Sequence, residues 1–291
     1  MIFQTGPARF VARTRQAPAT SAVSLCVAPD HLRLFGRNAR LYLLMVVITG
    51  AGKDQAAAAA EKIRQLTGAM VSGAAGDVSD PAVPEALVAQ AAAQMGGLDL
   101  LVTNAGGPPP GRFEIFDDAT WQNAVELSLL SHVRLIRAAL PLLRQSPAAS
   151  VLAITSYSVK QPIPNLVLSN SIRAATVGLI KSLALELGGE GIRFNSILPA
   201  WTETERVEAL MQARAKANGT SVAEEIARQA KDSPLGRMAA PEEFANAAVF
   251  LLSPAASYLT GVMLSVDGGM YKGILLRKHL PDQHLLHKRK R

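Results

Sequence analysis

From residue 46 onward, short apolar runs rich in β-branched residues alternate with longer segments of helical character. The runs lie at 46–50, 70–76, 98–103, 150–155, 192–198 and 262–266. The candidate helices between them lie at 54–67, 82–96, 118–145, 166–188 and 241–253, with one or two more over 203–231. This alternation predicts a parallel sheet, because each crossover helix returns the chain to the same end of the sheet.

No internal repeat or linker interrupts residues 46–273, so we expect one domain there. An irregular basic extension, 1–45, precedes it, and a basic tail, 274–291, follows it; neither end is expected to carry function. Hydrophobic residues make up 49% of the chain, which is enough for a sizeable core and excludes a disordered protein. The longest apolar run near the start, 41–48, is too short to span a bilayer, so no membrane partner is expected.

The formal net charge of +7 belongs to the two ends. Residues 1–45 carry six arginines and one acid, and residues 272–291 carry seven lysines and arginines and one acid. The remainder, 46–271, keeps 17 basic against 21 acidic residues and is mildly acidic. A nucleic-acid binder usually has a basic stripe across its folded surface, so no nucleic-acid partner is expected.

The sequence has one cysteine, Cys26, so an intrachain disulfide is impossible. This fits a reducing compartment, and we expect a cytoplasmic protein. The five histidines are scattered, so no metal site is predicted.

Several short motifs, in order from residue 77 to residue 269, resemble the short-chain dehydrogenase/reductase superfamily. They are Asp77-Val78, Asn104-Ala105-Gly106, 195–199 with Thr204, 234–237, 241–243, 250–253, 257–261 and 266–269. The resemblance implies a doubly wound, Rossmann-type α/β fold with helices on both faces of a parallel sheet. It also implies an oxidoreductase that uses NADP or NAD on a small-molecule carbonyl or alcohol. A divergent branch resembling 3-oxoacyl-carrier-protein reductases makes a 3-oxoacyl thioester a candidate substrate.

The resemblance assigns cofactor-binding roles to several of these positions. Asp77 and Val78 correspond to the pair that contacts adenine, and Asn104, Ala105 and Gly106 let the backbone approach the cofactor. Pro199 and Thr204 line the nicotinamide pocket. Lys53 could contact a 2′-phosphate and favour NADP, the alternative being a solvated charge at a helix start.

The catalytic positions of the family are occupied by different residue types here. Ser156 corresponds to the family's serine, whereas Ser169 stands at the tyrosine, Arg173 at the lysine and Ser128 at the asparagine of the preceding long helix. A serine hydroxyl is a far weaker acid than a phenol, whose pKa is near 10. A guanidinium stays charged, although its donors could still grip ribose hydroxyls.

Two other groups are possible proton carriers. Tyr157 and Lys160 lie just after Ser156 on a loop, and a surface tyrosine and lysine without a catalytic role are the alternative. His132, one turn beyond Ser128, could join a proton relay or be a buried, hydrogen-bonded helix histidine.

The family's glycine-rich phosphate loop has no good counterpart. In the stretch after Gly50, Asp54 and Ala56 stand where glycines are needed, and only the 26 residues 51–76 separate Gly50 from Asp77. A helix, a strand and a second helix do not fit that interval, since one βαβ unit takes roughly 30 residues or more. We therefore expect 46–50 to be the second strand, with the first strand–loop–helix unit missing or replaced, for example after a frameshift or a wrong start.

Three interpretations follow. The chain is an oxidoreductase in which Ser156 orients the carbonyl, Arg173 binds ribose, and Ser169 or a water handles the proton. Alternatively it is a non-catalytic binding or scaffold protein with the same fold, or the defective product of such a gene. Helices 118–145 and 166–188 correspond to the family's dimer-forming pair, so a homodimer or homotetramer is expected, and 203–231 is a natural substrate lid.

Overall fold

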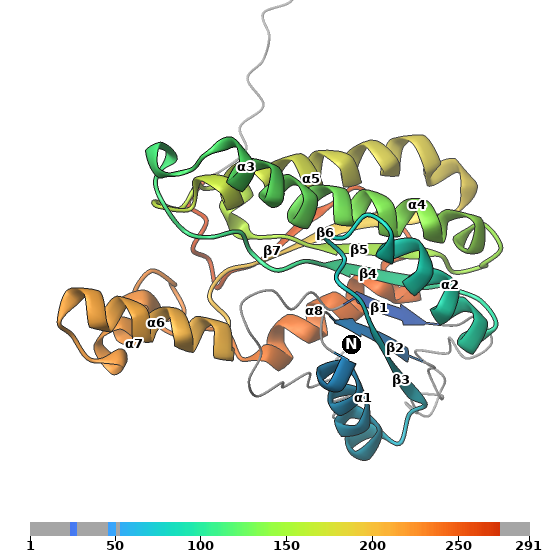
Figure 1. The fold of residues 1–291 in the computed structure, drawn as a ribbon, viewed down its shortest axis with the longest axis horizontal. Helices are drawn as coiled ribbons and strands as arrows, with labels where there is room; N and C mark the ends of the chain where they lie inside the picture. Colours follow the sequence, from blue (N-terminus) through green and yellow to red (C-terminus); the bar gives the residue numbers. More distant parts are fainter. Residues whose placement is uncertain (1–23, 28–45, 51–52, 274–291) are drawn as a thin grey trace, which may run out of the picture.

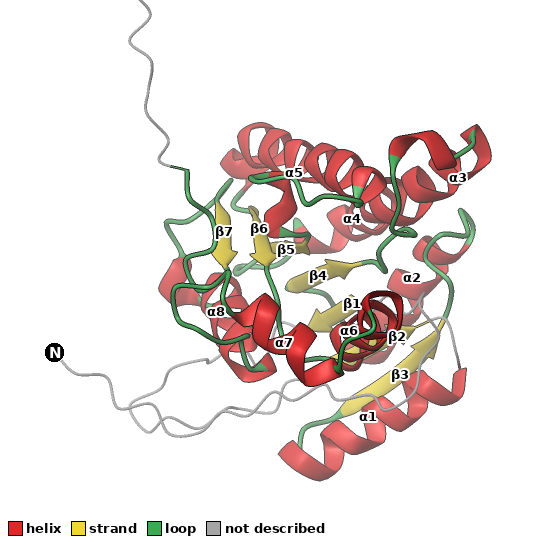
Figure 2. Cartoon of the chain, turned by 90° about the vertical axis from the view of Figure 1, so that its left-hand side faces the viewer, coloured by secondary structure: helices red, strands yellow, loops and turns green. Residues whose placement is uncertain are grey.

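The computed structural model describes residues 24–27, 46–50 and 53–273. Seven strands form one sheet in the order β3-β2-β1-β4-β5-β6-β7, which Figure 2 shows side by side from β7 to β3. Their bounds are β1 Ser24–Val27, β2 Val46–Gly50, β3 Val71–Ala75, β4 Leu100–Asn104, β5 Ser150–Ile154, β6 Arg193–Pro199 and β7 Met263–Val266. All neighbouring pairs are parallel except the two that involve β1.

Helices cover both faces of this sheet (Figure 1). On one face lie α2 Val83–Met95, α3 Asp118–Val125, α4 Ser131–Leu143 and α5 Val167–Leu187. On the other face lie α1 Lys53–Thr67 and α8 Pro241–Leu252. The predicted doubly wound, Rossmann-type fold is therefore confirmed, and the predicted bounds of α2, α5 and α8 agree to within about two residues, the usual uncertainty of helix ends.

The core has one layer on each side of the sheet. Strand residues such as Leu101, Val151 and Phe194 are fully buried against α2, α4 and α5. Leu152 and Ile197 face the other way, toward α1 and α8. Buried strands of a parallel sheet carry apolar residues on both faces, which is why their sequence runs are nearly continuous rather than alternating.

Gly73 shows how closely α1 approaches the sheet. A Cβ atom at this position of β3 would lie 2.5 Å from the carbonyl oxygen of Ala56 in α1. The glycine therefore lets the helix backbone pack directly on the strand, a close approach that any side chain would prevent.

The prediction that 46–50 is the second strand is confirmed, because β2 lies between β3 and β1. The prediction of an irregular extension over 1–45 is wrong at Ser24–Val27, which forms the strand between β2 and β4. This strand runs antiparallel to both neighbours, so the first strand is replaced by one of opposite direction. The rest of 1–45, residues 51–52 and the tail 274–291 lie outside the described residues.

The single helix predicted over 118–145 is divided in two. A π-helical turn, Glu126–Leu130, separates α3 from α4 and contains Ser128. Such turns insert one residue into the helical ladder and occur frequently at functional sites.

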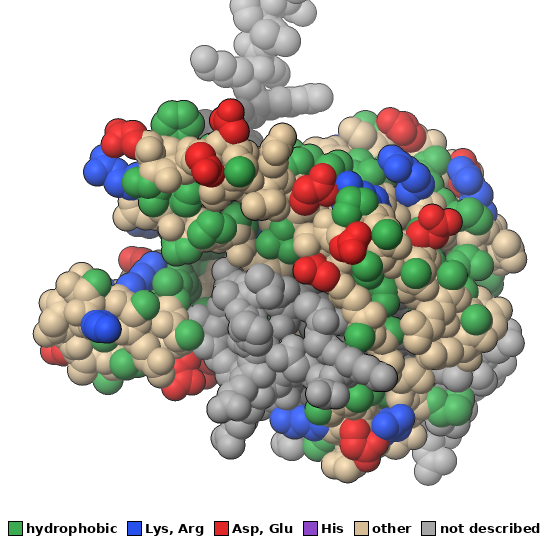
Figure 3. All heavy atoms as spheres, in the orientation of Figure 1, with side chains coloured by type: hydrophobic (Ala, Val, Ile, Leu, Met, Phe, Trp, Pro, Cys, Tyr) green, Lys and Arg blue, Asp and Glu red, His purple; other side chains and the backbone are tan. Residues whose placement is uncertain are grey.

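Two helices, α6 Glu205–Asn218 and α7 Val222–Ala230, extend from the body on the left of Figure 1. The sequence predicts one or two helices over 203–231, and the structure has two. Among the described residues no helix is both long and apolar enough to cross a membrane. On the face in Figure 3, acidic and basic side chains are interspersed rather than gathered by sign.

Candidate functional site at the carboxyl edge of the sheet

The ends of three parallel strands bring the predicted site residues to one edge. In the strand register, Asn104 of β4 lies beside Ile154 of β5, and Ile154 lies beside Ile197 of β6. The segments that leave these strands therefore emerge together, and ligands of doubly wound proteins bind at this edge. We call it the carboxyl edge.

The residues that the resemblance assigns to adenine and to the close approach of the cofactor have contrasting environments. The Asp77 carboxylate is exposed, and its Oδ1 accepts hydrogen bonds from the backbone N–H and the hydroxyl of Ser79, at 2.9 Å and 2.7 Å. Val78 is buried in the core, so its backbone rather than its side chain is available to a ligand. After β4, Asn104 is half-buried, whereas Ala105 and Gly106 are buried.

Ser156 stands just beyond the end of β5 and is half-buried. Its Oγ accepts a hydrogen bond from the backbone N–H of Ser158 at 3.1 Å, which caps a short 3₁₀ turn. Because the hydroxyl accepts there, its own proton can be donated to a substrate oxygen. Ser169 is half-buried in the first turn of α5.

Arg173 is buried on α5, with 7% of its surface exposed. Its Nη1 donates to the carbonyl oxygens of Ile154 and Thr155 at 3.4 Å and 3.2 Å. Its Nη2 donates to those of Ala105 and Gly106, both at 3.3 Å. The resemblance implied a grip on ribose, but both terminal nitrogens are directed at backbone oxygens, so that grip would require these hydrogen bonds to break.

Ser128, in the π-helical turn, is fully buried beside the same backbone. Its hydroxyl donates to the carbonyl oxygen of Gly106 at 3.4 Å, and its own carbonyl accepts from Thr176 Oγ1 of α5 at 2.6 Å. The turn is thus joined both to the loop after β4 and to α5. The partner Thr176 was missed from the sequence, because a threonine on an apolar helix face carries no distinct signal.

His132 of α4 is buried, and its Nδ1 lies 2.7 Å from Thr103 Oγ1 on β4. Burial, with a smaller contribution from the positive charge of Arg173, lowers the pKa of His132 to about 3. The imidazole is therefore neutral at neutral pH and cannot act there as a protonated acid. The interpretation as a buried, hydrogen-bonded helix histidine is confirmed.

Tyr157 and Lys160 have different surroundings. Tyr157 is buried, not on the surface as predicted, and packs with Leu198 and Met270, so burial raises the pKa of its phenol. Lys160 Nζ donates to the carbonyl of Met263 and the hydroxyl of Ser265 on β7, at 3.1 Å and 3.0 Å. The loop turns the two side chains to different partners.

The remaining predicted residues are placed as follows. Pro199 ends β6, and Thr204 is the N-cap of α6, its Oγ1 accepting from the backbone N–H of Val207 at 3.4 Å. The capping role alone accounts for a threonine at that position. Lys53 begins α1, but its side chain lies outside the described residues.

Beyond β6, the edge continues into a pocket of about 100 Å³ between the end of β7 and α7. Trp201, Met238 and Met270 are among the residues that line it. The Arg214 guanidinium of α6 stacks on the Trp201 ring with its carbon 5.1 Å from the ring centre. Within the described ranges, no three His, Cys, Asp or Glu side chains are grouped to hold a metal ion.

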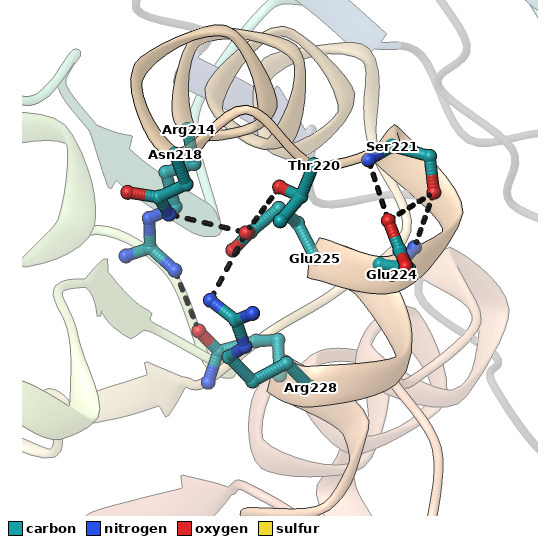
Figure 4. Close-up of polar contacts among 8 residues, drawn as sticks. Arg214, Asn218, Thr220, Ser221, Glu224, Glu225 and Arg228 are labelled. Carbon is teal, nitrogen blue, oxygen red and sulfur yellow. Dashed lines mark hydrogen bonds and ion pairs between the residues drawn. The ribbon is translucent and has the colours of Figure 1, made fainter.

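Polar contacts hold α6 and α7 together (Figure 4). The buried Glu225 carboxylate of α7 accepts from Thr220 Oγ1 at 2.7 Å and from Asn218 Nδ2 and Arg228 Nη1, both at 3.1 Å. Hydrogen bonds, first from Thr220 and then from Asn218, hold the pKa of Glu225 below its usual range. The helix pair is therefore an internally bonded unit.

The edge fits the two ends of a nicotinamide dinucleotide better than its pyrophosphate. The resemblance would place adenine at the ends of β3 and β4 and nicotinamide at the ends of β5 and β6, and α1 begins beside the end of β2. A parallel first strand would deliver a phosphate loop and a helix N-terminus to this edge. Here β1 is antiparallel, with Val27 beside Val46, so its own carboxyl end lies at the opposite edge.

Comparison with known proteins decides the family. Residues 44–271 match the family model described as enoyl-(acyl carrier protein) reductase. The chain belongs to the short-chain dehydrogenase/reductase superfamily, a family of oxidoreductases. The predicted resemblance is thus confirmed.

Curated relatives and solved structures of this superfamily show the same similarity. The chain is 30% identical to 7α-hydroxysteroid dehydrogenase of Escherichia coli K12 over 77% of its length and 83% of the relative. It is 31% identical to a 3-oxoacyl-[acyl-carrier-protein] reductase of Chlamydia trachomatis, over 77% of this chain and 86% of that one. The L-sorbose reductase of Gluconobacter frateurii, solved with NADPH and L-sorbose, gives a TM-score of 0.76 at 31% identity, covering 79% and 88% of the chains.

A further solved structure bears on the altered residues. It is an NADPH-bound short-chain oxidoreductase of Pseudomonas aeruginosa PAO1, described as containing an atypical catalytic center. Its TM-score is 0.72 at 28% identity, and the match covers 80% of this chain and 88% of that one.

Proposed function

We propose that this protein is an NAD(P)(H)-dependent oxidoreductase that reduces a small-molecule carbonyl or oxidises the corresponding alcohol. The observation that carries the proposal is the convergence of the family's motifs at the carboxyl edge of a sheet with the family's strand order. Relatives solved with NADPH support the choice of cofactor class. Similarity to 3-oxoacyl-carrier-protein reductases supports a 3-oxoacyl thioester as the first substrate to test.

The nicotinamide, when bound, supplies or accepts the hydride. The chain's own residues have to orient the carbonyl and manage the proton. Ser156 is suited to orientation, because its hydroxyl stands at the end of β5 with a proton to donate. Ser169 or an ordered water is left to carry the proton, since Tyr157 is buried among apolar side chains and His132 is neutral.

Three finer assignments belong to the same proposal. Lys53, at the start of α1 beside β2, would favour NADP over NAD by pairing with a 2′-phosphate. Helices α4 and α5 would form the contact of a homodimer or homotetramer. We also propose a cytoplasmic location, in keeping with a chain that has a single cysteine.

Titration of the purified full-length chain with NADPH and NADH, followed by nicotinamide fluorescence, tests the proposal. We expect saturable binding, with tighter binding of NADPH, and turnover of a 3-oxoacyl thioester. Ser156→Ala should lower kcat by about 10² because one positioned donor to the substrate oxygen is lost. A folded protein that binds neither nucleotide would refute the proposal.

The second candidate is a non-catalytic relative that binds a nucleotide or a partner protein. Two observations favour it: the terminal nitrogens of Arg173 are directed at backbone carbonyls, and a serine replaces the family's acid. Saturable binding without turnover on a broad carbonyl panel would support it. In that case Ser169→Tyr, which restores the phenol, tests whether the missing acid is the cause.

A further inference from the structure

We propose that Arg173 is a positioning residue that fixes the backbone at the ends of β4 and β5, so that the carboxyl edge keeps the shape a ligand needs. It acts through carbonyl groups and not by contact with ribose. The inference rests on the proposed function in one respect, namely that this edge binds a nicotinamide nucleotide.

The position of the guanidinium explains this role. The register of β4 and β5 ends at the pair Asn104 and Ile154. Just at and beyond this pair, Nη1 donates to the carbonyls on the β5 side and Nη2 donates to those on the β4 side. Arg173 therefore joins the two departing backbones where the ladder between the strands stops.

The chemistry requires arginine rather than lysine. A guanidinium is a planar fork whose two terminal nitrogens can serve two backbones at once, whereas an ammonium is a compact point charge on a flexible stem. The carbonyl of Gly106 also accepts the hydroxyl of Ser128, so this oxygen is held from both α5 and the π-helical turn. Lysine at 173 would keep the charge and lose the bridge.

The chain contains a matched control at the other end of the sheet. Arg193 begins β6, and its Nη1 donates to the carbonyls of Leu251, Ala256 and Leu259, at 2.7 Å to 3.4 Å. Its Nη2 donates to those of Leu252 and Ser253. It has the same chemistry as Arg173 but lies away from the carboxyl edge.

The two roles of Arg173 predict opposite results for Arg173→Lys. If residue 173 contacts ribose, lysine, the family's own residue, should preserve or improve nucleotide binding. If it positions the backbone, lysine should weaken NADPH binding on the order of tenfold. The backbone segments after β4 and β5 would shift and bind the nucleotide less well. It should also accelerate amide hydrogen exchange at 104–107 and 155–158.

The experiment compares the full-length wild type, R173K and R193K by NADPH titration and by hydrogen exchange. R193K should accelerate exchange at 251–260 and leave the NADPH dissociation constant within about twofold. Ser128→Ala removes the weaker hydrogen bond to Gly106 and should shift both readouts in the direction of R173K by a smaller amount. This second variant keeps the test decisive if R173K does not fold.

Binding by R173K that is equal to or tighter than that of the wild type would overturn the inference, as would unchanged exchange at 104–107. If the wild type binds neither nucleotide, the proposed function fails on its own. The exchange measurement then still decides the positioning role, because acceleration confined to the two loops upholds it and its absence refutes it.

Discussion

Arg173 and Arg193 are two arginines with the same local chemistry at opposite edges of one sheet. The guanidinium of each donates hydrogen bonds to backbone carbonyls. Those of Arg173 lie where the chain leaves β4 and β5, and those of Arg193 lie at the end of α8 and in the turn after it. A guanidinium suits both places because it can donate to several carbonyl oxygens at once, at the strand ends around Arg173 and at the C-terminal end of α8 around Arg193. The difference is location, since only Arg173 lies where a doubly wound protein binds its ligand.

The largest expected effect comes from replacing each arginine with methionine, which fills similar space without donors. Arg173→Met should lower the free energy of unfolding by about 3 kcal/mol, because buried carbonyls lose charged hydrogen-bond donors. Arg193→Met should cost about 2 kcal/mol, since Arg193 is less buried. Urea unfolding of both variants measures this.

The two methionine variants should differ in their affinity for NADPH. We expect Arg173→Met to lose NADPH affinity beyond what its stability loss explains, and Arg193→Met to retain it in the folded state. An equal loss of affinity in both would mean that the arginines act only through global stability.

The next largest effect is a pH dependence of stability that involves Arg173 and not Arg193. It arises from His132, whose pKa is lowered in part by the charge of Arg173. Its pKa is about 3 when folded, against an ordinary value near 6.5. Between these values the unfolded chain binds a proton that the folded chain does not, so stability is complete above pH 6.5 and falls as the pH drops toward 3. The loss from this group should be about 2 kcal/mol between pH 6.5 and pH 5.

Urea unfolding at several pH values checks this, with His132→Gln as the variant that should remove this part of the pH dependence. Arg173→Met should raise the pKa of His132, because the smaller of its two causes is removed while burial remains. Arg193→Met should leave it unchanged. An NMR titration in which His132 protonates near pH 6.5 in the folded wild type would contradict the expectation.

Elements of the fold differ in how well they can be predicted from the sequence. Long, strongly patterned elements such as α5 and β6 were predicted nearly to the residue, because burial on a sheet imposes the pattern directly. The strand Ser24–Val27 was missed, since four residues carry no period and their pairing depends on β2 and β4, which are distant in the sequence. The π-helical turn was missed because the apolar pattern continues through it.

The position of the candidate site could be predicted from the sequence, but the directions of its side chains could not. The order of motifs placed Ser156, Asn104 and Arg173 at the same edge, as the register confirms. Residue type alone could not show that the Arg173 guanidinium bonds to carbonyls, or that Tyr157 is buried while Lys160 bonds to β7. Side-chain direction is set by contacts between segments far apart in the chain, which a single sequence does not encode locally.

The smallest expected effect concerns a third buried charge, Glu225, which joins α6 to α7 in the helix pair beyond the strand ends (Figure 4). Glu225→Gln keeps the shape but loses the carboxylate that Thr220, Asn218 and Arg228 share, so exchange in 205–230 should rise by roughly a few-fold. Because the pKa of Glu225 is lowered in the fold, its contribution is present above its ordinary pKa and is lost as the pH falls through the lowered one. Glu208→Gln, on the exposed side of α6, is the matched control and should change nothing measurable. If amide exchange at 104–107 also rises in Glu225→Gln, the helix pair and the loops held by Arg173 are coupled. The carboxyl edge would then not be stabilised independently of α6 and α7.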